Sequence, residues 1–181
     1  CRRGQAVISR HAFTASPGLR LSLRSNTGDS THRIIQPVTI ATTFGELHIF
    51  NVHFSWIEEQ VRDNILEALS FVKRFEGMAL ITGDFNADAK SAVLEPLLTG
   101  GWSDLWNIVH PDDPGYTFES HAPTLRIDHA WANPALLRYM TDISVHHRET
   151  PMPPVRLSDH RALTVSLSLE EIHRLPVHEQ I

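Results

Sequence analysis

This sequence of 181 residues has very little cysteine, no long apolar run and no excess of positive charge. Its single cysteine, Cys1, excludes an internal disulfide and leaves the redox compartment open. No apolar stretch is long enough to span a bilayer, so the sequence predicts no transmembrane segment. The formal net charge of −5 argues against a broad electrostatic grip on a nucleic-acid backbone, although a local basic groove is compatible with it.

The composition is that of a globular domain, with 41% hydrophobic and 20% charged residues. The length suits one domain with a real core, which we expect to span residues 1–170, followed by a tail at 171–181. The first residues, "CRRGQAVISR", include no initiator methionine and no apolar signal core. Because a strand-like run begins almost at once, we expect that an upstream part of the protein is missing. Neither the cellular location nor the oligomeric state is indicated.

Strands are predicted where apolar and polar residues alternate or β-branched residues gather. Phe44-Gly45 predicts a hairpin turn between two such runs. Pro37 predicts that the first of these two strands is an edge strand or begins after the proline. The strand-like segments in this half of the chain are 4–10, 19–25, 34–43 and 46–54.

A helix is predicted after this hairpin. Ser55 and Glu58 fit a capping box, and apolar residues recur at helical spacing from Ile57 to Val72. Gly77 stands where a C-terminal cap is expected. The next strand, Met78–Ile81, leads into "GDFNAD". Beyond it, two short helices (91–101 and 103–109), further turns and strands (115–120, 126–133 and 143–149), a proline-rich loop (150–154) and a final strand (161–170) complete an α/β layered domain.

Polar residues of catalytic type stand at or beside the ends of four predicted strands. Sites in layered α/β folds favour strand ends, because the sheet holds such side chains rigidly while the loops stay open. Each group also has a structural interpretation: a core histidine, an Asx-type turn, a cross-strand pair of Arg126 with Asp128, or a helix cap. Their joint occurrence in this order is far more specific than any one of them. The groups are Asn51 with His53, Asp84 with Asn86, Asp128, and Asp159 with His160.

In this order the motifs resemble those of the endonuclease/exonuclease/phosphatase superfamily. "GDFNAD" is the strongest signature, and the resemblance runs from about Gly4 to about Val165. "GQAVISR" is similar to the family's G-x-A-[IV]-x-S-R strand, "NVHF" to its N-x-H motif, "RIDHAW" to its R-[IL]-D-[YH] strand, and "SDHRAL" to its S-D-H motif. The resemblance implies a four-layered α/β sandwich of two packed, mostly antiparallel sheets flanked by helices, here without its N-terminal strands.

The same resemblance implies metal-dependent hydrolysis of phosphoester bonds. His160 would be the general base that activates water, since an imidazole titrates near neutral pH. Asp128 would orient His160, and Asp84 would help position the nucleophile. The remaining implied roles are phosphate binding by Asn51, His53 and Asn86, and a metal site formed by Asp84, Asn86 and Asp159. Oxygen ligands of this kind suit Mg²⁺ or Mn²⁺.

Family domains also carry an asparagine and a metal-ligating glutamate upstream of the strand that "GQAVISR" resembles. Neither is present here, so we expect this chain to be the C-terminal larger part of its domain. On this expectation, the chain alone binds Mg²⁺ weakly and has little activity. A non-catalytic relative or fragment that acts as a binding module is therefore the main alternative to a Mg²⁺-dependent phosphodiesterase, phosphatase or nuclease.

A histidine-rich metal protein is a third and weaker hypothesis. His121, His146 and His147 show no regular spacing and have no cysteine partners, which indicates surface histidines. Trp56 follows the N-x-H strand and is the tryptophan most suited to line a site there. The sequence leaves open whether the phosphoester substrate is a nucleic acid, a lipid or a small molecule.

Overall fold

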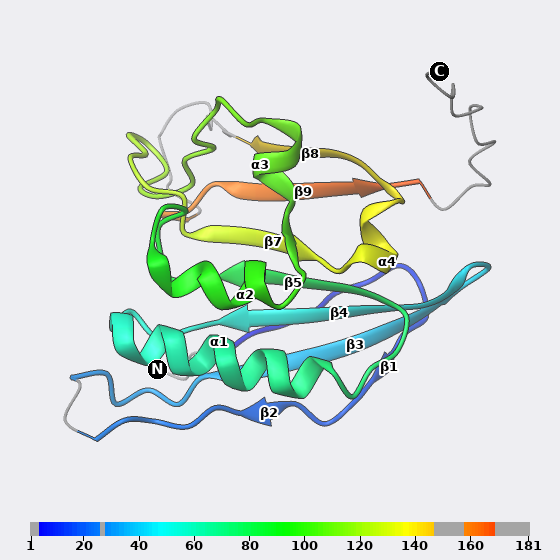
Figure 1. The fold of residues 1–181 in the computed structure, drawn as a ribbon, viewed down its shortest axis with the longest axis horizontal. Helices are drawn as coiled ribbons and strands as arrows, with labels where there is room; N and C mark the ends of the chain where they lie inside the picture. The colour runs from blue at the N-terminus through cyan, green and yellow to red at the C-terminus, as the bar shows by residue number, and fades with distance from the viewer. Residues whose placement is uncertain (1–3, 26–27, 147–157, 169–181) are drawn as a thin grey trace, which may run out of the picture.

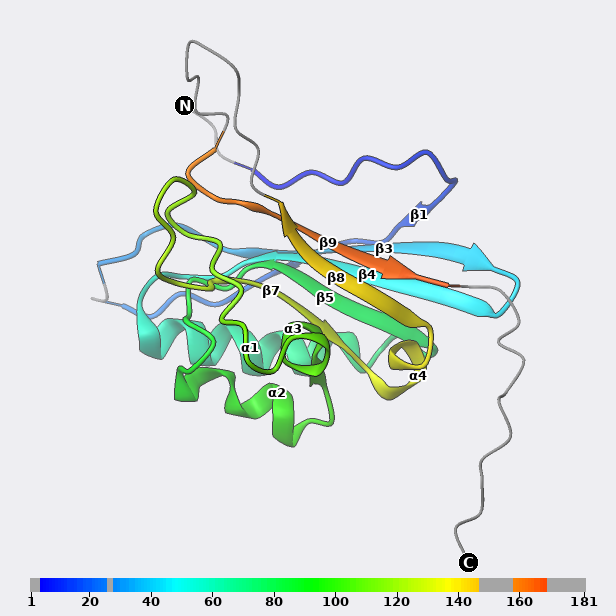
Figure 2. The same ribbon diagram turned by 90° about the horizontal axis from the view of Figure 1, so that it is seen from above.

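The computed structural model describes residues 4–25, 28–146 and 158–168. In these residues a large sheet of seven strands has helices α1 and α2 on one face, and a two-stranded sheet, β8–β9, lies toward the other (Figures 1 and 2). The strand order is β1-β3-β4-β5-β7-β6, and β2 also pairs with β3. The elements are β1 (Thr14–Ala15), β2 (Leu19–Arg20), β3 (Ile34–Thr42), β4 (Gly45–His53), α1 (Glu58–Val72), β5 (Met78–Asp84), η1 (Ala92–Leu94), α2 (Glu95–Thr99), β6 (Ser103–Asp104), α3 (Leu105–Val109), β7 (Asp128–Ala132), α4 (Pro134–Leu137), β8 (Met140–His146) and β9 (Ala162–Leu167).

The pairing of the strands is mostly antiparallel, as expected. Among the strands that the structure describes, only β4 and β5 run parallel, and α1 makes the crossover between them. The mixed α/β fold with a large antiparallel-dominated sheet is therefore confirmed. Within the described residues the layers are helices, the large sheet and the small sheet, and the four-layered arrangement stays a prediction.

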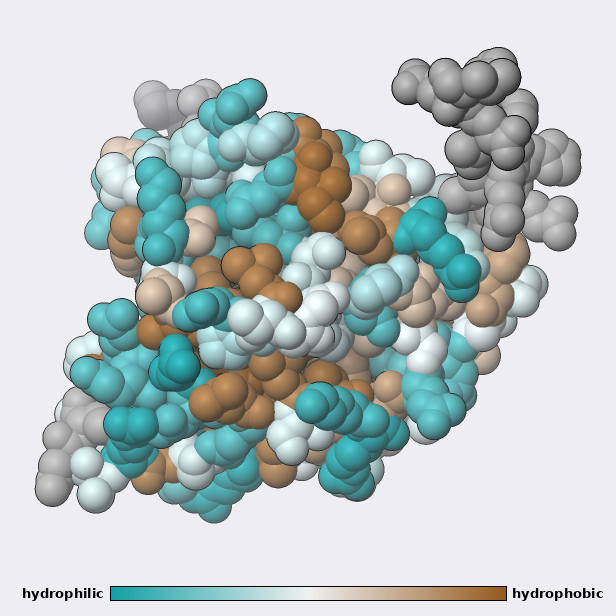
Figure 3. Space-filling model, viewed as in Figure 1, coloured by the Kyte–Doolittle hydropathy of each residue, from teal (hydrophilic) through white to brown (hydrophobic). Residues whose placement is uncertain are grey.

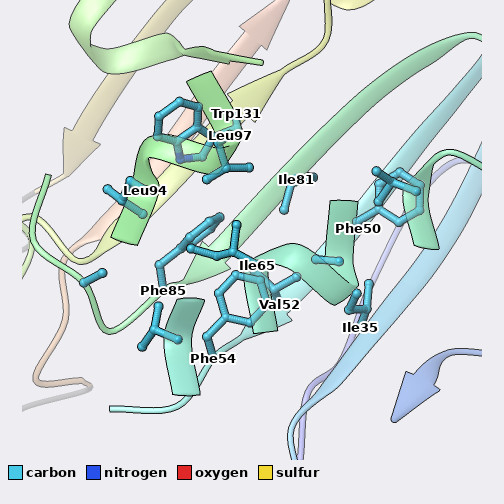
Figure 4. Close-up of a cluster of buried hydrophobic side chains, with 14 of the residues drawn as sticks. Ile35, Phe50, Val52, Phe54, Ile65, Ile81, Phe85, Leu94, Leu97 and Trp131 are labelled. Atoms are coloured by element: carbon cyan, nitrogen blue, oxygen red, sulfur yellow. The ribbon is translucent and has the colours of Figure 1, made fainter. Parts of the chain in front are cut away.

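Two apolar clusters fill the spaces between these layers. The cluster on the helical face joins α1 and α2 to the large sheet through Phe50, Val52, Ile65, Ile81 and Trp131 (Figure 4). The second cluster lies between the opposite face of β4, β5 and β7 and the small sheet. Burial of this apolar area is the main source of stability.

The outer surface of the helical layer carries some apolar side chains as well. Figure 3 shows apolar residues near the middle of this face with hydrophilic residues around them. Leu66 of α1 and Leu98 of α2 are among the exposed large hydrophobic residues. Scattered exposed leucines of this kind are normal on a globular surface and carry no functional argument.

The predicted strand at 4–10 is wrong. These residues form no strand, and Ile8 is 96% exposed. Burial alternates along the segment, and Gln5, Val7 and Ser9 are its partly buried residues. The physical reason is that no strand in the described part of the chain pairs with this segment. One side-chain bond joins the segment to the sheet: Asn51 Nδ2 of β4 donates to the Ala6 carbonyl at 3.3 Å.

The segment at 19–25 alternates as predicted but pairs over a short stretch. Leu21 is buried, Leu19 and Leu23 are partly buried, and the intervening residues face solvent. Strand β2 covers Leu19–Arg20, and one further bond runs from the Leu21 N–H to the Arg33 carbonyl.

The hairpin is confirmed, but its turn lies one residue earlier than predicted. Thr42 pairs with Gly45, so Thr43 and Phe44 form the turn, and Gly45 opens β4 with a φ of 114°. Strand β3 begins before Pro37 and is paired on both sides, which contradicts the expected edge strand. The proline is tolerated because it lies between the residues that pair with β2 and those that pair with β1.

The helix is confirmed over Glu58–Val72, with Val61, Ile65 and Val72 buried as its spacing predicted. Both predicted caps are wrong. Ile57 is the N-cap residue, and the Ser55 hydroxyl donates instead to Asp29 Oδ2 at 2.7 Å.

Gly77 lies beyond the end of the helix, where Lys73 is the C-cap residue. The predicted short helices appear as η1 with α2 and as α3, and the last two predicted strands appear as β8 and β9. The segment at 115–120 makes only isolated bridges, at Phe118. The proline-rich loop, His147, Leu169 and the 171–181 tail lie outside the described residues.

Gly83 is the glycine on which the end of β5 depends. Its φ is +138°, and a Cβ atom there would lie 2.0 Å from the Val52 carbonyl oxygen of β4. We expect Gly83→Ala to lower the free energy of unfolding by at least about 2 kcal/mol, because backbone strain and a backbone clash add. Urea unfolding measures this, and Gly45→Ala is the control, since its φ is +114° with open space around it. Equal losses in the two variants would show that the clash contributes nothing.

Candidate active site

Three polar side chains from neighbouring strands form one row at the end of the large sheet. Parallel pairing sets His53 of β4 opposite Asp84 of β5, and antiparallel pairing sets Asp128 of β7 opposite Asp84. Residues in register point to the same face of a sheet, so the three side chains stand side by side. The sheet therefore unites three of the four motifs that lie far apart in the sequence.

The sheet face that carries this row changes from apolar to polar along the strands. At one end, residues such as Leu47, Leu80 and Ala132 pack in the cluster beneath the small sheet. Along the same face of β4 and β5 follow Asn51 and Thr82, and then His53 and Asp84. The polar row thus begins where the apolar packing against β8–β9 ends.

His160, just before β9, completes the group. Its Nδ1 lies 2.8 Å from Asp128 Oδ2, and its ring lies 5.0 Å from that of Phe118. The backbone next to His160 is held in place as well, because the Arg161 N–H donates to the Thr117 carbonyl at 2.8 Å. The contact that the resemblance implied between Asp128 and His160 is therefore present.

Asp84 divides its two carboxylate oxygens between structure and site. Oδ1 accepts the Asn86 N–H at 2.8 Å, which closes an Asx-type turn. Oδ2 faces the histidines, at 3.4 Å from His53 Nε2 and 4.0 Å from His160 Nε2. The turn interpretation of "GDFNAD" and the functional one are thus both compatible with its geometry.

Asn86 is held in a left-handed conformation, with a φ of 50°. Its Nδ2 donates to the Phe54 carbonyl at 2.9 Å, which ties the loop after β5 to the end of β4. Within the described residues its Oδ1 makes no hydrogen bond, so this oxygen is available to a ligand.

Burial and neighbouring charges shift the pKa of three groups in the row. The hydrogen bond that His160 donates to Asp128 raises the pKa of His160. Burial lowers the pKa of His53, and the nearby positive charges of Arg33 and His160 lower it further. Burial raises the pKa of Asp84. His160 is thus the more basic of the two imidazoles, which suits it to accept a proton.

The predicted residues Asn51 and Asp159 lie at the margin of this group. The Asn51 amide donates to the Ala6 carbonyl, and the Asp159 side chain is exposed while its carbonyl accepts the Ser120 N–H at 2.7 Å. Trp56 is 58% exposed, and His121 and His146 are exposed as predicted.

A buried network behind the row was missed by sequence reasoning. Arg126 does not pair with Asp128; its guanidinium binds Asp104 through two bonds, of 3.0 and 2.8 Å, and Nη1 contacts His129 Nδ1 at 3.2 Å. His129 Nε2 lies 2.9 Å from the Ala87 carbonyl. Complete burial lowers the pKa of His129 to about 4, so the ring is neutral and Nε2 donates to Ala87. The network holds the loop after β5 against β7.

A sequence signal for this network does exist. Arg126 and His129 stand near Asp128 at the start of an otherwise apolar strand, and buried polar groups of this kind require partners. The partners themselves, Asp104 and a main-chain carbonyl, come from segments that only the fold brings near.

The family model of the endonuclease/exonuclease/phosphatase family matches residues 1–160. The chain belongs to this family. It is thereby placed among phosphoester hydrolases in general, and the resemblance of its motifs is confirmed. Among curated proteins, none matches the sequence significantly.

Several solved structures of other proteins share the fold of this chain. The 3′ phosphatase NExo from Neisseria, bound to a product DNA hairpin, is 19% identical, with 86% of this chain and 72% of that chain covered and a TM-score of 0.62. A family protein from Leptotrichia buccalis is 20% identical, with 88% and 63% covered and a TM-score of 0.68. The mannosyl-6-phosphatase of Bacteroides thetaiotaomicron is 21% identical, with 86% and 67% covered and a TM-score of 0.63.

Proposed function

We propose that this chain carries the water-activating part of a phosphoester hydrolase. The observation that supports it most is the 2.8 Å contact between His160 Nδ1 and Asp128 Oδ2. With Nδ1–H donated to Asp128, the Nε2 atom of His160 carries the lone pair that takes a proton from water. At 4.0 Å, Asp84 Oδ2 is too distant for a hydrogen bond to Nε2 and leaves that atom free to act.

The neighbours of this pair suit the handling of a phosphate. His53 and Asn86 lie on either side of Asp84 and offer hydrogen-bonding groups to phosphate oxygens. Asn51, on the same face of β4 as His53, extends this surface. Charge that develops on the phosphate as water attacks would be stabilised by these groups.

The divalent ion is part of the proposal. In the described residues no group of three or more histidine, cysteine, aspartate or glutamate side chains is arranged to hold a metal. Mg²⁺, however, often takes only one or two protein carboxylates together with waters and substrate phosphate. Asp84 Oδ2 and Asn86 Oδ1 are donors of that type, and Asp159 would contribute directly or through water. When bound, Mg²⁺ or Mn²⁺ supplies positive charge to the phosphate.

The test of this proposal is turnover of a generic phosphodiester and a generic phosphomonoester, with added Mg²⁺ and after chelation. We expect Asp84→Asn to reduce the rate by about 10- to 100-fold and to raise the Mg²⁺ concentration required, because an amide oxygen carries no charge. The control is Asp142→Asn, which changes an exposed aspartate of β8. A normal rate and a normal Mg²⁺ titration in Asp84→Asn would leave this residue with its turn role alone.

A further inference from the structure

Asp128 and His160 come from different sheets. Asp128 opens β7 of the large sheet, and His160 stands two residues before β9 of the small sheet. Among the described residues no ladder of backbone hydrogen bonds joins these two sheets. Strand register therefore leaves the distance between the two side chains open, and other contacts are needed to hold the pair together.

Residues 117–120, here called the connecting segment, lie between the two. On the side of β7, the Thr117 N–H donates to the Leu125 carbonyl at 2.8 Å. Thr117 Oγ1 accepts the N–H groups of Ile127 and Asp128, each at 3.3 Å. Because Thr117 is fully buried, water has no access to take the place of this hydroxyl. The hydroxyl of Thr117 thus holds the backbone at the start of β7.

The same residue is bonded to the segment that carries His160. The Thr117 carbonyl accepts the Arg161 N–H, next to His160, at 2.8 Å. Ser120 adds a second link, since its N–H donates to the Asp159 carbonyl at 2.7 Å. The connecting segment therefore holds the backbone on both sides of His160, and Thr117 ties this backbone to that of β7.

We infer that Thr117 is a positioning residue of the proposed hydrolase: its hydroxyl fixes the backbone of Asp128 and its carbonyl fixes that of Arg161, which sets Asp128 opposite His160. Thr117 acts through this pair and has no role in binding the phosphate. The inference rests on the proposed function, because the position of the pair matters for the rate only if the pair activates water. A displacement of about 1 Å at such a site can cost about 100-fold in rate.

Thr117→Val tests the hydroxyl, because valine has nearly the same shape and keeps the carbonyl. The change leaves the two N–H groups of β7 without their acceptor. We expect kcat for a generic phosphodiester with Mg²⁺ to fall by about 10- to 100-fold and KM to change by less than about threefold, since the groups that bind phosphate are untouched.

Two further threonine variants control for packing. Thr117→Ser keeps the oxygen and should retain kcat within about threefold of the wild type. Thr39→Val removes a hydroxyl of β3 that lies 2.8 Å from His48 Nδ1, five residues along β4 from His53, and should retain the wild-type kcat. A loss confined to Thr117→Val would assign the effect to the oxygen of Thr117.

A spectroscopic measurement reads the position of the pair without any turnover. The Nδ1 proton of His160, in the 2.8 Å contact with Asp128 Oδ2, should give a low-field resonance that exchanges slowly with water. The chain is labelled at its histidines, and loss of the signal in His160→Ala identifies it. We expect Thr117→Val to broaden or remove this signal, and Thr117→Ser to retain it.

The inference would be overturned by a wild-type kcat together with a wild-type signal in Thr117→Val, or by an equal loss in Thr117→Ser, which would indicate packing alone. Absence of the signal in the wild-type chain would overturn it as well, since the pair would then not be held. A wild-type chain that hydrolyses no phosphoester, but shows the expected signals in all variants, would refute the hydrolase proposal alone.

A second site decides the matter if urea unfolding shows that Thr117→Val does not fold. Ser120→Ala removes the bond from Ser120 Oγ to the Ser158 carbonyl, which is 2.9 Å long and lies at the more exposed end of the connecting segment. It should weaken the His160 signal and reduce kcat by about threefold to tenfold, the effect of one hydrogen bond. An unchanged signal and rate in this variant would show that the connecting segment does not position the pair.

Discussion

Replacing His160 with alanine is expected to reduce kcat for a phosphoester by about two to four orders of magnitude, the usual cost of a missing general base. Its Nε2 is the free nitrogen of the Asp128–His160 pair, and no neighbour in the row can replace it. Burial lowers the pKa of His53, which makes that imidazole a weaker base. Asp84 uses one carboxylate oxygen in its turn.

The fold should survive this substitution. His160 is part-buried at the end of a strand and belongs to neither apolar cluster, so its loss opens no core cavity. Urea unfolding and the far-ultraviolet spectrum check this directly. His146→Ala, an exposed histidine of β8, is the matched control. Activity within a few-fold of wild type in His160→Ala would refute its assignment as the base.

The elements that the sequence predicted well are those in which a local pattern and the tertiary structure agree. In α1, the spacing from Val61 to Val72 already defines the face that packs on the sheet. The β3–β4 hairpin needs only its own two strands to form, and its register follows from a short turn. The strand into "GDFNAD" ends in a glycine and an Asx-type turn, so its polar end is also a local property.

The sequence-based predictions are wrong at positions where a residue far away in the sequence determines the local structure. The run at 4–10 has strand composition, but a strand exists only when another pairs with it, and none does so within the described residues. Ser55 has the spacing of a capping box, yet its hydroxyl donates to the distant Asp29 and accepts the Ile57 N–H, and Ile57 is the N-cap residue. Arg126 stands two residues from Asp128, but a bidentate geometry with Asp104 is more favourable for a buried guanidinium.

The candidate site lies between these two cases. Each motif could be read from the sequence, and their order pointed to one row. The distances between the motifs could not be predicted, because the row depends on the register of three strands and on the backbone bonds that bring His160 to Asp128.

Asp128→Asn is expected to be nearly as harmful as His160→Ala, within about tenfold of it, because a triad acts as a unit. The asparagine side chain keeps the shape but carries no charge to stabilise the imidazolium that forms. It can also present its amide N–H to Nδ1, which would favour the tautomer with the proton on Nε2. In that tautomer Nε2 has no lone pair for the attacking water.

The pH dependence distinguishes this role from a purely structural one. The hydrogen bond that His160 donates to Asp128 is the main cause that raises the pKa of His160. The rise of the wild-type rate with pH should therefore level off at a pH above the ordinary pKa of histidine. Without the carboxylate the pKa falls, and the acid limb of the pH–rate profile should move to lower pH at a much lower plateau. The double variant with His160→Ala should be no worse than His160→Ala alone. An unchanged acid limb, or two losses that multiply, would show that Asp128 and His160 do not work as a pair.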